Sequence, residues 1–223
     1  MIPEQLKQRM LAGMNAQMTM RATQFEQLPP PPGQVVFFGD SITEGGLWHE
    51  WFPGLPLVNR GIGGNTVDDL IARVDTAIAD PAAVFVLVGT NDLDTSSVME
   101  LVFPRGPLLT VDEIAARMRI LVAAIRERAP QAPLFVQSVM PRQAELAEML
   151  GKLNTHYRHI AQGSGATYLD LWPALADESG GLRPDYTLDN LHLTGLGYAA
   201  WVEVLAPHVA ALDLARPSDS IRH

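Results

Sequence analysis

Cysteine is absent from this sequence, and long apolar runs and positive charge are also scarce. Without a thiol, the chain cannot use cysteine catalysis, disulfides or thiolate-bound metals. No apolar run resembles a signal segment or is long enough to cross a bilayer, so we expect a cytoplasmic protein, although a secreted chain trimmed of its signal would look the same. The 16 basic residues stand against 25 acidic ones, and the net charge of −9 argues against nucleic acid or an anionic membrane as the main partner.

The sequence is rich in alternating strand-like and helix-like patterns. Its 223 residues suffice for one α/β domain with a buried core, and 47% hydrophobic residues are typical of a globular chain. Segments of helical period separate apolar runs that predict five strands, at 34–39, 57–62, 84–89, 133–140 and 166–172. The helical segments present apolar faces over 67–78, 111–125, 146–160 and 198–209. This alternation predicts a parallel sheet with helices on both faces.

The N-terminal segment lies outside this rhythm. Residues 2–27 predict an amphipathic helix, and Pro29 to Pro32 form a stiff spacer before the first strand. We therefore divide the chain into this helix and linker (1–33) and a domain (34–223) that contains all five predicted strands. The methionine-rich stripe of the helix favours docking on its own domain or on a second copy of the chain, that is, a homo-oligomer. Its apolar residues are Leu6, Met10, Met14, Met18 and Phe25.

The connection at 91–110 is the second unusual segment. It is long for a link between a strand and a helix, and it is rich in apolar residues. Loops of this length in a compact domain are often functional, so we expect a lid or a binding wall.

Polar side chains follow several of the predicted strands, at the edge where open α/β sheets bind ligands. Ser41 follows the first run within FFGDSIT, the glycine-rich NRGIGGNT follows the second, GTND follows the third, and DNLH precedes the last helix. Serine is a weak nucleophile unless a base takes its proton and an acceptor orients that base. His192 can be the base, and Asp189, three residues upstream, can hold its imidazole.

Acyl transfer also needs donors for a developing oxyanion. Gly64 would let a backbone N–H approach closely, and Asn91 offers a side-chain amide. A plainer interpretation of the first block is that Asp40 and Ser41 cap the next helix, which both residue types do well.

Together the four blocks resemble the SGNH hydrolases, also called the GDSL esterase and lipase family. GDSIT matches the serine block, GIGGNT the glycine block, GTND the asparagine block and DNLH the Asp-x-x-His block, in the family's order from residue 39 to residue 192. Within the family, the sequence most resembles the branch of platelet-activating-factor acetylhydrolase-like and carbohydrate O-acetylesterase-like members. The segments that carry this resemblance are GDSITEGG, NRGIGG, Met140-Pro141-Arg142 and LHLTGLGYAAW. Asn190 is a departure, because glycine is more usual there in that branch.

The resemblance implies a flavodoxin-like three-layer α/β/α fold with a five-stranded parallel sheet, hydrolysis of esters, and neither a metal nor another cofactor. It implies Ser41 as the nucleophile, His192 as the base and Asp189 as its partner. It also implies Gly64 and Asn91 as oxyanion donors, together with the N–H of Ser41.

Several assignments have alternatives. Asp185 also lies in the loop before His192 and could replace Asp189. We interpret Asp40 as a support behind Ser41. Arg60 and Arg142 stay open between substrate contact and structural ion pairing.

Two further patterns could indicate a cofactor or metal site, but a structural role is the more common explanation for each. The glycines at 61, 63 and 64 suggest a dinucleotide site, but Thr66 stands where that motif needs its third glycine. His156 and His159 lie one helical turn apart and could bind a metal, although a solvated helix face is the commoner use of such a pair.

From the sequence we expect a serine esterase for short acyl groups, above all acetyl on a small or carbohydrate-like alcohol. The apolar residues at 93–103 keep a thioesterase or lysophospholipase with longer acyl specificity as an alternative. A catalytically silent binding module is a third reading, and the filled catalytic positions argue against it.

Overall fold

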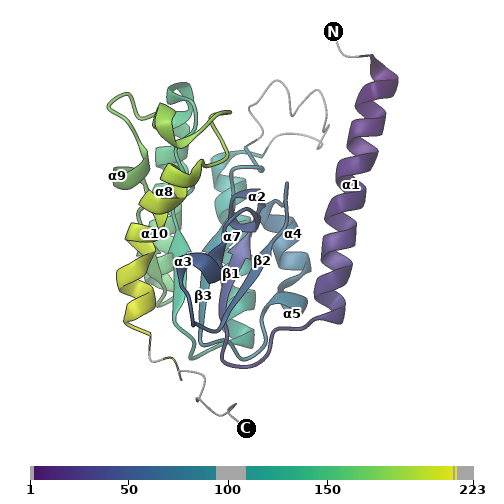
Figure 1. Ribbon diagram of the computed structural model, residues 1–223. Helices are drawn as coiled ribbons and strands as arrows, with labels where there is room; N and C mark the ends of the chain where they lie inside the picture. The colour runs from purple at the N-terminus through teal and green to yellow at the C-terminus, as the bar shows by residue number, and fades with distance from the viewer. Residues whose placement is uncertain (1–2, 94–108, 213, 215–223) are drawn as a thin grey trace.

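A five-stranded parallel sheet forms the centre of the computed structural model, which describes residues 3–93, 109–212 and 214 (Figure 1). Its strands lie in the order β2-β1-β3-β4-β5, which is the flavodoxin-like order. The strands are β1 (Val35–Gly39), β2 (Leu57–Gly61), β3 (Ala83–Leu87), β4 (Leu134–Gln137) and β5 (Thr167–Leu169). All five predicted strands are confirmed, each shorter than the apolar run that predicted it, and the difference is largest for β4 and β5.

Helices precede, connect and follow the strands. They are α1 (Glu4–Gln27), α2 (Ser41–Glu44), α3 (Trp48–Trp51), α4 (Val67–Ala72), α5 (Val74–Ala77), α7 (Val111–Arg128), α8 (Ala147–Gly163), α9 (Trp172–Leu175) and α10 (Gly195–Ala210), with 3₁₀ turns η1 (Ala144–Leu146) and η2 (Pro184–Tyr186). Helix α7 begins at a capping box, in which the Thr110 hydroxyl accepts from the Glu113 N–H and the Glu113 carboxylate accepts from the Thr110 N–H.

One helix prediction needs correction. The apolar face over 67–78 is divided between α4 and α5, because the backbone of Arg73 leaves the helical conformation at φ −121° and ψ 16°. This break accompanies the use of the Arg73 side chain as a bridge between loops, described below.

The sheet separates two hydrophobic cores, as the three-layer prediction requires. Alternate residues of β1 enter opposite cores: Phe38 packs with α4, α7 and α8, whereas Phe37 packs with α3, α9 and α10. All five residues of β1 are buried, which accounts for its uninterrupted apolar run.

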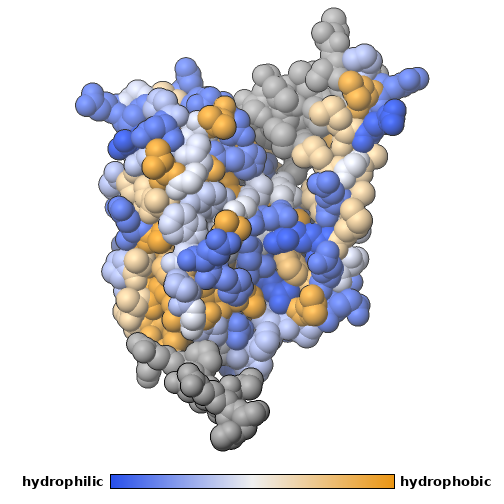
Figure 2. Space-filling view, viewed as in Figure 1, coloured by the Kyte–Doolittle hydropathy of each residue, from blue (hydrophilic) through white to orange (hydrophobic). Residues whose placement is uncertain are grey.

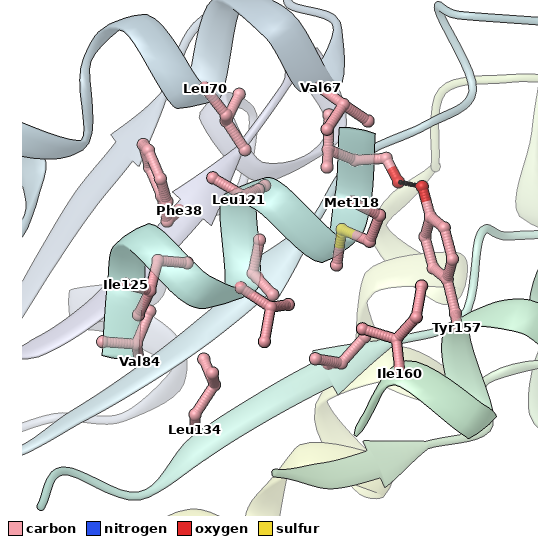
Figure 3. Packing of buried hydrophobic residues seen from close by; sticks show 14 of the residues in the cluster. Phe38, Val67, Leu70, Val84, Met118, Leu121, Ile125, Leu134, Tyr157 and Ile160 are labelled. Atoms are coloured by element: carbon pink, nitrogen blue, oxygen red, sulfur yellow. Dashed lines mark hydrogen bonds between the residues drawn. The ribbon is translucent and has the colours of Figure 1, made fainter. Parts of the chain in front are cut away.

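The two cores differ in composition. The first is mainly aliphatic, and Figure 3 shows Leu121 and Ile125 of α7 beside Phe38 of the sheet. The dashed line in that view is the Tyr157 hydroxyl donating to the Val88 carbonyl oxygen (3.2 Å). The second core is aromatic, with stacked or edge-on rings from residues that include Phe37, Trp48, Phe85, Phe135 and Trp201.

Helix α1 lies along the outside of the domain and extends beyond the carboxyl edge of the sheet (Figure 1). The predicted helix is confirmed over Glu4–Gln27, and weakly hydrophobic side chains run along it (tan in Figure 2). Met18 and Phe25 are half-buried, whereas Leu6 and Met10 are 48% and 42% exposed. Among the described residues, the C-terminal part of the stripe is therefore more buried than its N-terminal end.

No helix within the described ranges is long and apolar enough to cross a membrane.

Most of the predicted lid or wall at 91–110 lies outside the described residues. At its two ends, Leu93 is buried in the first core and Leu109 is half-buried against it.

Candidate active site

Ser41 is the first residue of α2, directly after β1. Asp40 caps this short helix, because its Oδ1 accepts from the Ile42 N–H (3.0 Å). The carbonyl of Thr43 and that of Glu44 accept from the Asn59 amide, each at 3.0 Å. The turn that carries Ser41 is thereby tied to β2 as well as to β1.

Glycine is required where this turn lies on the sheet. A Cβ atom on Gly39 would stand 2.1 Å from the Thr43 hydroxyl and 2.4 Å from the Leu87 carbonyl oxygen. A Cβ atom on Gly61, which pairs with Gly39 across the sheet, would stand 2.2 Å from the Glu44 nitrogen. Gly61 thus meets the backbone of α2, whereas Gly39 meets the Thr43 side chain of α2 and the backbone of β3. A larger residue at either position would displace α2 or the neighbouring strand.

A hydrogen-bonded chain of three side chains starts at Ser41. Its Oγ lies 2.9 Å from Nε2 of His192, and Nδ1 of His192 lies 2.7 Å from Oδ2 of Asp189. Because a carboxylate can only accept, Nδ1 carries the proton and Nε2 accepts from the Ser41 hydroxyl.

The loop that holds the histidine is ordered by its own carboxylate. Oδ1 of Asp189 accepts from the N–H groups of Leu191 (3.0 Å) and His192 (2.7 Å). Partial burial by itself raises the pKa of Asp189, but the hydrogen bonds from His192 and Leu191 bring it below its usual value. Asp189 is therefore held as a carboxylate against the imidazole.

The backbone conformation of Asn190 explains why asparagine can replace the more usual glycine at this position. Its φ is +60°, in the left-handed region that glycine adopts freely and that asparagine tolerates better than most residues. Its carbonyl oxygen accepts from Nε of the buried Arg142 (3.0 Å), whose Nη1 donates to the Thr90 hydroxyl (2.8 Å). Arg142 thus ties the histidine loop to the loop that follows β3.

Ser41 and His192 open into a cavity of about 190 Å³ at the carboxyl edge of the sheet. Gly64 and Asn91, the two predicted oxyanion donors, line the same cavity, and Ile62 and Leu191 contribute apolar surface. One face of α1 closes the opposite side. The described residues thus bring the serine, the histidine and both predicted donors to one space.

The loop after β2 is fixed by hydrogen bonds at each end. The Gly63 N–H donates to Oε2 of Glu44 (2.5 Å), and Gly64 follows with φ +74°. The Asn91 amide donates to the Asn65 carbonyl oxygen (3.0 Å), so Asn91 and the glycine loop hold each other in place.

Arg73 binds three of these elements at once. Its guanidinium donates to the carbonyl oxygens of Gly39 and Arg60, each at 2.8 Å, and to the side chain of Asn65 at 2.7 Å. Burial lowers its pKa to about 9, although Asp69 and Asp40 act in the opposite sense. This residue was not singled out from the sequence, where it reads as one polar position in a helix.

Two carboxyl groups lie buried behind the cavity. Burial raises the pKa of Asp40 to about 6, against the lowering effect of the Ile42 N–H and of His192. Burial likewise raises the pKa of Asp92 to about 7. Both oxygens of Asp92 accept from the Val67 N–H at 3.1 Å, which anchors the start of α4. Asp40 thus lies behind Ser41 as expected, and Asp92 had no assigned role.

Other predicted positions lie elsewhere. Arg60 does not line the cavity: it is buried, donates to the Leu28 carbonyl oxygen and stacks on Phe25, so it contacts the N-terminal segment and not the substrate space. Asp185 pairs with Arg183 (3.2 Å) and not with the histidine.

His156 lies 3.2 Å from Asp112. Among the residues that the structure describes, no three histidine or acidic side chains gather in a group that could hold a metal ion.

Comparison with known protein families gives a direct match over residues 37–200, to the GDSL-like lipase/acylhydrolase model. The chain belongs to the GDSL-like lipase/acylhydrolase family. This acylhydrolase is therefore a carboxylic ester hydrolase, and the resemblance drawn from the four blocks is confirmed.

The acylhydrolase is also similar to curated proteins from mammals. It is 29% identical over 177 residues to the platelet-activating factor acetylhydrolase IB subunit alpha1 of Pongo abelii, covering 74% of this chain and 71% of that protein. It is 28% identical over 177 residues to the alpha2 subunit of Rattus norvegicus, with the same coverage of both chains.

Solved structures with the same fold are more distant in sequence. A Streptococcus pneumoniae protein matches with a TM-score of 0.80 at 21% identity, over 93% of this chain and all 100% of that one. An acetyl-xylooligosaccharide esterase from Geobacillus stearothermophilus matches with a TM-score of 0.65 at 20% identity, over 85% of this chain and 100% of that one. At these identities the likeness establishes the three-layer fold.

The raised pKa of Asp92 makes stability depend on pH. The folded acylhydrolase binds this proton more tightly than the unfolded chain, so the contribution of Asp92 to the free energy of unfolding falls as pH rises from 3.8 to about 7. Asp92→Asn keeps an acceptor for the Val67 N–H and removes the titration. The free energy of unfolding of the variant minus that of the wild type should grow by up to about 1.4 kcal/mol per pH unit over this interval and then level off.

Chemical denaturation at a series of pH values measures this difference. Glu203→Gln, at an exposed position of α10, is the control and should follow the wild type. Parallel profiles for Asp92→Asn and the wild type would contradict the assignment of the raised pKa to Asp92.

Proposed function

We propose that this acylhydrolase is a serine esterase that hydrolyses short-chain carboxylic esters through an acyl-enzyme on Ser41. The observation that carries the proposal is the hydrogen-bonded chain from Ser41 through His192 to Asp189 at the wall of a small cavity. Family membership supplies ester hydrolysis as the reaction, and the residue roles are our assignment.

In the first half of the reaction, Ser41 receives the acyl group of the ester. Nε2 of His192 takes the hydroxyl proton while Oγ forms a bond to the carbonyl carbon of the ester. The carbonyl oxygen becomes an oxyanion that accepts from the N–H groups of Ser41 and Gly64 and from the amide of Asn91. Because an amide has two N–H bonds and Asn91 uses one for Asn65, the other is left for the oxyanion.

The first half ends when the tetrahedral intermediate collapses: the bond to the alcohol oxygen breaks, and His192 returns its proton to that oxygen. In the second half, His192 deprotonates a water molecule that attacks the acyl carbon. The second intermediate then breaks its bond to Oγ, His192 returns the proton to Ser41, and the acyl group leaves as an acid. Throughout, Asp189 keeps Nδ1 protonated and stabilises the imidazolium.

The dimensions of the cavity favour small acyl groups. Its volume of about 190 Å³ is below the roughly 300–1,000 Å³ of pockets that enclose drug-sized ligands. Two of the similar proteins carry acetyl in their names, as an acetylhydrolase and an acetyl-xylooligosaccharide esterase. We therefore assign acetyl-type esters as the substrate class, with a carbohydrate O-acetyl ester as the specific candidate.

The alternative is a thioesterase or lysophospholipase with longer acyl specificity. It depends on the apolar residues at 93–103, of which only Leu93 lies among the described residues. Leu93 is buried in the hydrophobic core and does not line the cavity, which favours the short-chain reading.

Two expectations from the sequence stay predictions. One is self-association through the exposed apolar residues of α1, Leu6 and Met10. The other is a cytoplasmic location.

Replacing the nucleophile tests the mechanism. Ser41→Ala should lower kcat/KM for p-nitrophenyl acetate by at least about 10,000-fold, because no other group can form the acyl-enzyme. A fluorophosphonate probe should label the wild type and the control Ser179→Ala, which lies outside the cavity. Near-normal hydrolysis by a folded Ser41→Ala protein would contradict the mechanism.

The two acidic candidates can be separated by matched amide substitutions. Asp189→Asn should lower kcat by roughly 1,000- to 10,000-fold, because an amide no longer fixes the tautomer of the histidine. Asp185→Asn breaks only an exposed pair with Arg183 and should change kcat by less than about threefold. Steady-state kinetics on both variants decides, and the reverse ranking would assign the acidic role to Asp185.

Acyl chain length tests the substrate class. We expect kcat/KM over p-nitrophenyl esters to be highest from acetyl to butyryl and to fall steeply by octanoyl. An open apolar channel would instead add about 0.8 kcal/mol per methylene, so that hexanoyl would exceed acetyl by roughly 200-fold. A maximum at octanoyl or beyond would replace the short-chain assignment with the lipase or thioesterase alternative.

A further inference from the structure

The wall of the cavity opposite the strand-end loops is one face of α1. Met14, Gln17, Met18 and Arg21 all line the cavity together with Ser41. Their spacing of three, one and three residues places them on a single side of the helix. The segment that precedes the domain therefore takes part in the site that the domain carries.

Arg21 fixes this face to the catalytic loops. Its Nε donates to the Gly61 carbonyl oxygen (2.6 Å) and lies 3.1 Å from Oε1 of Glu44. The other oxygen of Glu44 accepts from the Gly63 N–H, next to the proposed donor Gly64. Helix α1 is thus joined through one carboxylate to the loop that frames the oxyanion.

A second contact holds the C-terminal end of α1. Two cations lie near the ring of Phe25, with the guanidinium carbon of Arg60 4.5 Å and that of Arg21 5.2 Å from its centroid. Arg60 also donates to the Leu28 carbonyl oxygen. These contacts give the wall a defined position relative to Ser41.

The side chains that α1 presents suit a small apolar group. Met14 and Met18 are long, unbranched and only partly buried, with Met14 37% exposed. Thioether side chains adapt their shape to apolar partners. Ile62 and Leu191 line the same cavity, so both α1 and the loops of the domain contribute apolar surface to it.

We propose that Met14 and Met18 of α1 are specificity-determining residues, which limit the length of a carbon group of the ester bound at Ser41. The inference rests on the proposed function and deepens it, because it assigns chain-length selection to the N-terminal helix. Shortening either side chain enlarges the cavity while leaving Ser41, His192 and Asp189 unchanged.

Alanine variants with a matched control test this assignment. Met14→Ala and Met18→Ala are compared with Met20→Ala, which removes the same side chain from an exposed position of the same helix outside the cavity lining. One series of p-nitrophenyl esters lengthens the acyl group from acetyl to octanoyl. A second series of acetates lengthens the alcohol from methyl to octyl.

Each newly accommodated methylene is worth about fourfold in kcat/KM. In one of the two series, the ratio of kcat/KM for the six-carbon group to that for the two-carbon group should rise by about 10-fold or more for Met14→Ala or Met18→Ala. Met20→Ala should keep the wild-type ratio within about twofold, and the series that responds shows which side of the ester α1 contacts. Wild-type ratios in both series for folded Met14→Ala and Met18→Ala proteins would overturn the inference.

Variants that loosen the contact between α1 and the catalytic loops provide a second measurement. Arg21→Ala removes the contacts to Gly61 and Glu44 and should relax chain-length selection in the same series, whereas the exposed Arg9→Ala should not. Circular dichroism confirms folding, and Met18→Leu should retain the wild-type selection. A wild-type protein that hydrolyses neither series and does not react with the fluorophosphonate probe would overturn the proposed function itself. This outcome differs from an active wild type whose α1 variants keep normal chain-length selection, which would overturn only the role of Met14 and Met18.

Discussion

The candidate active site depends on the close approach of one helical turn, α2, to two strands, β1 and β2. Helix α2 can lie on β1 and β2 only because Gly39 and Gly61 have no side chains at the point of contact. This contact sets the position of Ser41 relative to the sheet, and all the other contributors reach it from loops at the same edge. Parallel strands favour such an arrangement, because their carboxyl ends meet on one side.

Three arginines join the loops that this edge brings together. Arg73 binds carbonyl oxygens at the carboxyl ends of β1 and β2, Arg142 binds the histidine loop to the residues after β3, and Arg21 binds α1 to the last residue of β2. A guanidinium has five donors in a rigid plane, so one side chain can satisfy acceptors on several segments. The protein is negatively charged overall, yet it uses these buried or partly buried cations locally.

The sequence was sufficient for the strands and for the four catalytic blocks, because both are encoded in short contiguous patterns. It was insufficient for Arg73, since nothing local indicates which loops a long side chain will reach. The same holds for α1: periodicity predicts its apolar stripe, but the partner of that stripe depends on tertiary packing. At Asn190 the pattern showed an exception, and its positive φ supplies the reason.

Ser41 and His192 are 151 positions apart, and their contact has a consequence for the order of events during synthesis. A nascent chain can form β1, α2 and the glycine loop while it still lacks His192, the proposed base of Ser41. Closing so long a loop is among the slower steps of folding, because its entropy is lost before the contact forms. Under the proposed mechanism, hydrolysis therefore begins only after residue 192 has emerged and its loop has reached Ser41, which separates synthesis of the serine turn from the onset of its chemistry.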